Sequence, residues 1–184
     1  MPTPTPSRLL AALAVAVALQ CRPAAGAPPV PPRPTAVFPV EFADTSGEAP
    51  RPGRDAQVAA TTAGLADLLA GSGRYRAVDL APVRGRLAAA GPLHRCGGCW
   101  VDLAREAGAE VAAVTVVHKM STLVSSMRVW VVDVATRHVV REGAVSLRGD
   151  DDEAWRRAAR YLARNVLLDE GRARPSLSSP FPGG

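Results

Sequence analysis

The chain has 184 residues, of which 47% are hydrophobic and 21% are charged, and its formal net charge is +5. This composition suits one globular domain with a hydrophobic core and excludes a disordered or fibrous chain. The arginines are scattered along the chain and Lys119 is its only lysine. Because the positive charge is not gathered into a basic arm, we expect no nucleic-acid partner.

Residues 1–26 have the layout of a secretory signal peptide. Arg8 precedes an apolar run from Leu9 to Leu19, and small residues follow at positions 24–27. The run is too short to span a bilayer, and no later apolar stretch is long enough to do so. We expect cleavage between Gly26 and Ala27, since cleavage after Ala27 would place a proline next to the cut bond. The mature protein is therefore predicted to be periplasmic, without a transmembrane segment.

Cys21 raises the alternative of a lipoprotein, because a lipid-modified cysteine would tether the chain to a membrane. The segment that precedes Cys21 is a poor match to the lipoprotein signal, since the bulky Gln20 stands where a small residue is required. We therefore expect soluble export in preference to a lipid anchor at Cys21.

The composition divides the rest of the chain into three parts. Residues 27–35 are rich in proline and predict an extended linker. Residues 36–168 carry the periodic apolar patterns of a single α/β domain. Residues 169–184 consist largely of Arg, Pro, Ser and Gly, a composition that predicts a disordered tail.

The first half of the domain alternates strands and helices. A strand is predicted at 36–42, although Pro39 lacks a backbone donor and suits an edge or an irregular position. Apolar residues at helical spacing predict a helix over 55–70, which stops at a Gly-Ser-Gly segment. A second strand and two shorter helices are predicted at 75–80, 82–90 and 100–107.

The second half of the domain predicts three consecutive strands and a helix. The β-branched run 109–117 is typical of a strand covered on both faces. Runs at 125–134 and 139–147 flank a short polar connection, as antiparallel neighbours do. We therefore expect an α/β fold with a mixed sheet, in which early βα crossover units are followed by an antiparallel three-strand meander and a C-terminal helix.

The segment Cys96-Gly97-Gly98-Cys99 is the only reactive-looking motif. In an exported protein such a pair most often forms a structural disulfide, and this is our leading interpretation. A thiol redox role is an alternative, because Cys99 lies just before a helix. The aromatic residue that usually precedes the first cysteine of such a pair is missing, since Arg95 stands before Cys96. Metal binding by His94, Cys96 and Cys99 is a weaker alternative, since a closed zinc site requires four ligands. We expect no cofactor.

Charged residues gather before and along the last helix. Asp150 and Glu153 have the spacing of a capping box, and negative charge there complements the helix dipole. One face of the helix is apolar and the other carries Arg156, Arg157, Arg160 and Arg164. Such a face is usually solvated; the alternative is contact with an acidic partner or with lipid headgroups.

His118 and Lys119 end the long strand, where polar groups can mark a site at a sheet edge. With the four arginines, they are the candidates for partner contact. The chain has no H-E-x-x-H, no G-x-S-x-G and no phosphate-binding glycine loop, so we expect no enzymatic activity.

Several segments resemble a family of exported bacterial proteins described only as a domain of unknown function. The likeness is carried by residues 37–38, 42–46, 72–75, the C-x-x-C pair, 118–123, 131–136 and 147–155. Pro39 and the doubled Asp151-Asp152 depart from the usual pattern of that family. The predicted order of elements is also similar to the amino-terminal domain of TolB and to CsgG. This resemblance implies an assembly or docking role in the bacterial envelope.

The leading hypothesis is therefore a non-enzymatic, periplasmic module that binds a periplasmic or envelope protein. The alternative is a thiol redox or metal-handling protein that uses Cys96 and Cys99.

Overall fold

A computed structural model describes residues 30–168 of the chain. The chain divides into two units, residues 1–30 and 31–184, and the description below concerns the second. The predicted signal peptide, Cys21 and the predicted tail 169–184 lie outside the described residues.

Six strands form one mixed sheet in the order β3-β1-β4-β5-β6, and β2 also pairs with β4. β1 and β2 run parallel to β4 along successive parts of its length, and β3 runs parallel to β1. β4, β5 and β6 form an antiparallel meander. This confirms the predicted α/β fold class. The strands are β1 (Arg33–Val37), β2 (Glu41–Asp44), β3 (Tyr75–Ala77), β4 (Val111–Lys119), β5 (Ser125–Asp133) and β6 (Val139–Leu147).

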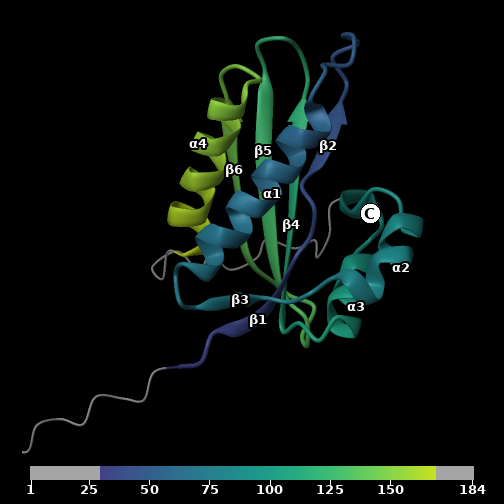
Figure 1. The fold of residues 1–184 in the computed structure, drawn as a ribbon, viewed down its shortest axis with the longest axis vertical. Helices are drawn as coiled ribbons and strands as arrows, with labels where there is room; N and C mark the ends of the chain where they lie inside the picture. The colour runs from purple at the N-terminus through teal and green to yellow at the C-terminus, as the bar shows by residue number, and fades with distance from the viewer. Residues whose placement is uncertain (1–29, 169–184) are drawn as a thin grey trace, which may run out of the picture. The chain divides into compact units, whose positions relative to one another are not determined.

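Helices cover both faces of the sheet (Figure 1). α1 and α4 pack on one face, and α3 with the short turns around it packs on the other. The helices are α1 (Arg54–Ala70), α2 (Arg84–Ala89), α3 (Cys99–Glu106) and α4 (Asp152–Leu162), with the short 3-10 helices η1 (Ala81–Val83) and η2 (Leu93–Arg95) and the π-helical segment η3 (Ala163–Leu167).

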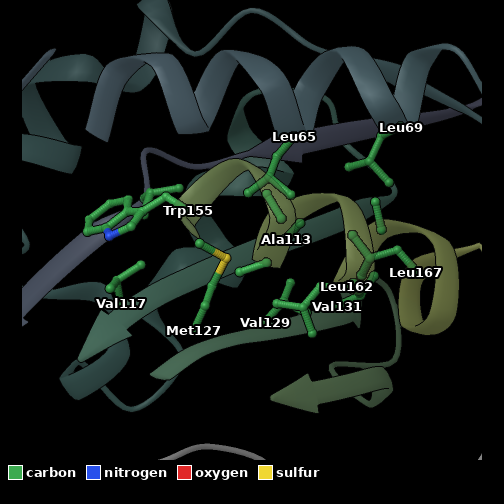
Figure 2. Packing of buried hydrophobic residues seen from close by; sticks show 14 of the residues in the cluster. Leu65, Leu69, Ala113, Val117, Met127, Val129, Val131, Trp155, Leu162 and Leu167 are labelled. Atoms are coloured by element: carbon green, nitrogen blue, oxygen red, sulfur yellow. The ribbon is translucent and has the colours of Figure 1, made fainter. Parts of the chain in front are cut away.

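β4 is the centre of the core, and eight of its nine residues are buried. Its residues alternate between the two core clusters: Val117 faces α1 and α4, whereas Val116 faces the side of α3. Figure 2 shows the first cluster, in which Leu65 of α1 and Trp155 of α4 close over β4 and β5. Burial on both faces explains why the β4 segment is almost continuously apolar.

The predicted single strand at 36–42 is two strands, and Pro39 is the reason. Phe38 still donates to Ala113 of β4, at 3.1 Å. Pro39 has no N–H to donate, and the next N–H, of Val40, bonds to the hydroxyl of Thr62 on α1, at 2.9 Å. Pairing with β4 resumes at Glu41. The chain therefore leaves the ladder for a few residues and fastens α1 to the sheet at that point.

β1 begins at Arg33, inside the segment predicted to be a proline-rich linker. Pro34 is tolerated there because pairing with β4 starts one residue later, at Thr35 and Val111. Its carbonyl still accepts a hydrogen bond from the N–H of Glu110, at 2.8 Å. β1 therefore starts before residue 36.

The cap of α4 differs from the predicted capping box by one residue. Asp151 is the N-cap, and its side chain accepts a hydrogen bond from the N–H of Ala154, at 2.7 Å. Asp150 is engaged instead with Arg54 of α1. Glu153 pairs with Arg156 and Arg157 rather than reaching back to the cap.

Candidate functional site

The carboxyl ends of β2 and β4 meet at one end of the sheet. The two strands are parallel, and their last paired residues are Asp44 and Lys119. The β4–β5 turn, residues 120–124, projects from this end (Figure 1). Polar groups brought together in this way are typical of functional sites in α/β proteins.

Lys119 is an internal cation with three carboxylates around it. Its side chain is 6% exposed, and Nζ lies 2.7 Å from Glu48, 3.8 Å from Asp150 and 4.0 Å from Asp44. The hydrogen bond to Glu48 raises the pKa of Lys119. In turn Lys119 and the Thr122 hydroxyl lower the pKa of Glu48, and Ser46 lowers the pKa of Asp44. Lys119 therefore links the end of β4 to the loop after β2 and to the segment before α4, and its side chain is buried.

Arg54, at the start of α1, belongs to the same group of charges. We call Lys119, Asp44, Glu48, Asp150 and Arg54 the charged cluster. Its guanidinium lies 4.1 Å from the centre of the Phe42 ring and 5.1 Å from that of Trp155. It also forms an ion pair with Asp150, in which both side chains are largely buried. Burial alone would raise the pKa of Asp150, but Arg54, the indole N–H of Trp155 and Lys119 together lower it. Asp150 thus joins α1, α4 and the end of β4.

The β4–β5 turn is apolar, exposed and internally hydrogen bonded. Leu123 is 81% exposed, and Met120 and Val124 are about half exposed. Met120 and Ser121 donate to the carbonyl of Val124, at 2.9 and 3.1 Å. The Ser121 hydroxyl accepts from Leu123 and Val124, at 3.3 and 3.2 Å. The Thr122 hydroxyl donates to the carboxylate of Glu48, which also forms an ion pair with Lys119. We call residues 120–124 the apolar tip.

A cavity of about 810 Å³ lies beside this end of the sheet. The loop after β2 and the first turn of α1 line it, together with Phe42 and Asp44 of β2. Glu48 belongs both to the cavity wall and to the support of the apolar tip.

His118 stands next to Lys119 but points to a different partner. Its Nε2 lies 2.8 Å from the hydroxyl of Thr45, which follows β2. His118 is half-buried and tethers the loop after β2 to the end of β4.

The cysteine turn lies on the other face of the sheet from α4, where its residues pack with α3. The sulfurs of Cys96 and Cys99 are 2.08 Å apart, so the two residues form a disulfide. His94 does not turn toward them: its Nδ1 lies 2.6 Å from the carboxylate of Glu41, and its N–H bonds to the same oxygen at 3.0 Å. Over residues 30–168, no three His, Cys, Asp or Glu side chains form a group suited to a metal ion.

All four arginines of α4 and η3 are exposed. Arg156 and Arg157 pair with Glu153, at 2.6 and 3.5 Å. Arg160 and Arg164 form no ion pair within the described part of the chain. The sequence-predicted candidates therefore do not form one site, because the arginines and the cysteine turn lie on opposite faces of the sheet.

The sequence prediction did not include Asp44, Glu48, Arg54 or the apolar tip. A usable signal exists for the first of these. Asp44 ends a strand that is parallel to β4, as Lys119 ends β4, so both fall at the same sheet edge. No signal in the sequence shows that Arg54 contacts the rings of both Phe42 and Trp155, because Trp155 is far from the other two residues in the chain.

Comparisons with known proteins give a family and several distant likenesses. The LpoB C-terminal domain from Salmonella enterica is 16% identical, with a TM-score of 0.47 over 65% of this chain and 85% of that chain. Lipoprotein GNA1162 from Neisseria meningitidis is 18% identical, with a TM-score of 0.45 over 66% of this chain and 84% of that chain. The PelC dodecamer from Paraburkholderia phytofirmans is 13% identical, with a TM-score of 0.44 over 72% of this chain and 86% of that chain.

No curated protein matches the chain. Among the described residues, no helix has both the length and the apolar character needed to cross a membrane. The similarity to TolB and CsgG stays a prediction. The family model DUF3280, described as a protein of unknown function (DUF2380), matches residues 33–167. Because this match spans most of the chain, the protein belongs to the DUF3280 family, which agrees with the predicted resemblance to a domain of unknown function.

Proposed function

We propose that this protein is an exported, non-enzymatic module that binds a protein partner in the periplasm or envelope through the apolar tip. One observation carries the proposal: three large apolar side chains, Met120, Leu123 and Val124, are exposed together in one five-residue turn. Single exposed apolar residues are ordinary, but a cluster of them on a folded domain is typical of an interaction site.

The bracing of the apolar tip supports this proposal. Its backbone is hydrogen bonded within the turn, and Thr122 ties it to Glu48 and thereby to the buried Lys119. A surface that is already ordered loses less conformational entropy when it binds. The charged cluster beneath it therefore has a role in binding, which is to hold the apolar tip in one conformation.

The export signal predicted in residues 1–26 supports the location of the partner. We propose a structural role for the Cys96–Cys99 disulfide, because it fixes the entry to α3, whose Trp100 and Val101 are buried. Hydrogen bonds from the backbone of Leu93 and His94 to Glu41 hold the same turn against β2.

Site-specific photocrosslinking tests the proposal in the full chain, expressed in its native cells. A photoreactive phenylalanine analogue replaces Leu123, and in the control it replaces Ala88, which is exposed on α2. We expect a discrete crosslinked protein band from position 123 and none from position 88. The additional substitution Met120→Ser should reduce the yield at position 123 at least fivefold, since hot-spot residues at an interface act as a cluster.

The stability of the variants separates a binding defect from a folding defect. Leu123→Ser should change the free energy of unfolding by less than about 0.5 kcal/mol, because the side chain is exposed. Equal crosslinking from positions 123 and 88, or no band from position 123 under several growth conditions, would rule out the apolar tip as the docking surface.

A further inference from the structure

A second surface lies on α4 and η3, well separated in sequence from the apolar tip. Four arginines and one tyrosine form it, and we call it the arginine row: Arg156, Arg157, Arg160, Tyr161 and Arg164. All five side chains are exposed, and Tyr161 is 51% exposed. At 3.6 residues per turn, Arg156, Arg157 and Arg160 fall within an arc of about 100° on the helix surface.

Folding alone does not explain this row. Arg156, Arg160 and Arg164 are successive i, i+4 neighbours, and like charges at this spacing destabilise a helix. A cation near the C-terminus of a helix interacts favourably with the dipole, which accounts for Arg164 but not for a row along the whole face. Glu153 neutralises only the first two arginines.

The opposite face of α4 is buried in the core. Trp155, Ala158 and Leu162 are buried in the cluster that α4 forms with the sheet and α1. Figure 2 shows Trp155 and Leu162 in this cluster. The close contact between Val166 of η3 and Gly143 of β6 fixes the end of the helix on the sheet, since any side chain at position 143 would collide with Val166. The arginine row is thus presented outward by a rigidly seated element.

We infer that the arginine row binds the phosphate groups of an anionic lipid surface. A guanidinium donates two parallel hydrogen bonds to a phosphate, which an ammonium does not. A membrane presents phosphates in a plane, and several arginines on one helix face can meet more than one of them at once. The exposed Tyr161 of the row fits the same partner, because tyrosine rings prefer the boundary between headgroups and acyl chains.

Export is the part of the proposed function on which this inference rests, since it is what brings the chain to envelope lipids. Binding to purified vesicles does not depend on the protein partner, so the two proposals fail separately. The contact would hold the domain at a membrane surface while the apolar tip engages its partner.

Flotation with vesicles tests the inference on the purified protein. We expect binding to vesicles of phosphatidylcholine with phosphatidylglycerol at low salt, and none to phosphatidylcholine alone. R160E/R164E should lose at least tenfold in partitioning, and Y161S about threefold. The matched control R84E/R95E has the same change in net charge on exposed residues of α2 and η2, and should lose less than twofold.

Two outcomes would overturn the inference. Equal losses in R160E/R164E and R84E/R95E would show that net charge, and not the arginine row, drives the binding. Failure to float with anionic vesicles, together with binding to poly-glutamate that R160E/R164E abolishes, would assign the row to an acidic protein instead. Circular dichroism of each variant establishes that the helix is intact.

Discussion

Asp150 is the residue on which the candidate site depends most. It accepts from Arg54 at 2.9 Å and from the indole of Trp155 at 3.2 Å, and it faces Lys119 at 3.8 Å. Two cations in a largely buried setting therefore share one carboxylate. A buried ion pair contributes little compared with an apolar replacement, but loss of one partner leaves an uncompensated buried charge.

We expect Asp150→Asn to lower the free energy of unfolding by about 3 kcal/mol, measured by urea denaturation, because it leaves Arg54 without its ion-pair partner. The control is Asp152→Asn, at an exposed position in the first turn of α4, which should cost less than about 0.5 kcal/mol. If both variants lose the same amount, the charge of the helix N-terminus is the cause and the ion pair is not.

The partners of individual charged residues were the hardest feature to predict from the sequence. The pattern marked His118 and Lys119 as polar residues at a strand end, which is where the structure has them. Their orientation depends on partners that come from distant segments, namely Thr45 for His118 and Glu48 for Lys119. Periodicity carries no information on such pairs, because it reports only which face of its own element a residue occupies.

At the scale of elements, apolar periodicity was sufficient to predict the bounds of a strand or helix where tertiary contacts reinforced it. The strand at 139–147 has its predicted bounds, and the helix at 55–70 begins one residue earlier than predicted. Two predicted strands differ from the structure. Pro39 divides one predicted strand in two, and the strand predicted at 75–80 ends at Ala77. The N–H of Val78 still bonds to Thr35, after which the chain turns into η1.

The disulfide stabilises one element junction rather than the whole fold. It closes a loop of four residues, so the chain-entropy model gives about 2 kcal/mol. We expect the double variant C96S/C99S to fold with the same circular dichroism spectrum and to lose about 2 kcal/mol in free energy of unfolding. Dithiothreitol should lower the stability of the native protein by a similar amount.

A matched variant separates the contribution of the disulfide to stability from that of the hydrogen bonds that also hold this turn. Glu41→Gln alters the contacts to Leu93 and His94 and leaves the disulfide intact. If the cysteines instead carry a redox function, C96S/C99S should lose function while its stability is unchanged, which would contradict the structural role.

At the scale of the whole molecule, carboxylates link elements that are distant in sequence. Asp133 at the end of β5 pairs with Arg33 of β1, and Asp102 of α3 pairs with Arg137 of the β5–β6 turn. Thr136 and then Arg33 lower the pKa of Asp133, and Arg137 lowers that of Asp102. With Asp44, Glu48 and Asp150, these groups make the stability of the domain depend on pH in a defined direction.

A carboxyl group whose pKa is lowered by folding stabilises the native state when it is ionised. Its contribution is complete above the ordinary pKa, 3.8 for Asp and 4.5 for Glu, and is lost as the pH falls through the lowered value. The raised pKa of Lys119 acts at the alkaline end: its contribution is complete below the ordinary value of 10.5 and is lost as the pH rises through the raised value. We therefore expect the melting temperature to be nearly constant across the neutral range and to fall in acid below about pH 4.

Thermal melts of the wild type and of Asp150→Asn across this range test the assignment. The variant has lost one of the groups with a lowered pKa, so its melting temperature should be lower at neutral pH and should change less on acidification. The two curves should converge at the acid end, where Asp150 of the wild type is itself protonated. Parallel curves would mean that Asp150 has the same pKa in the folded and unfolded states, and that the ion pair with Arg54 does not contribute to stability.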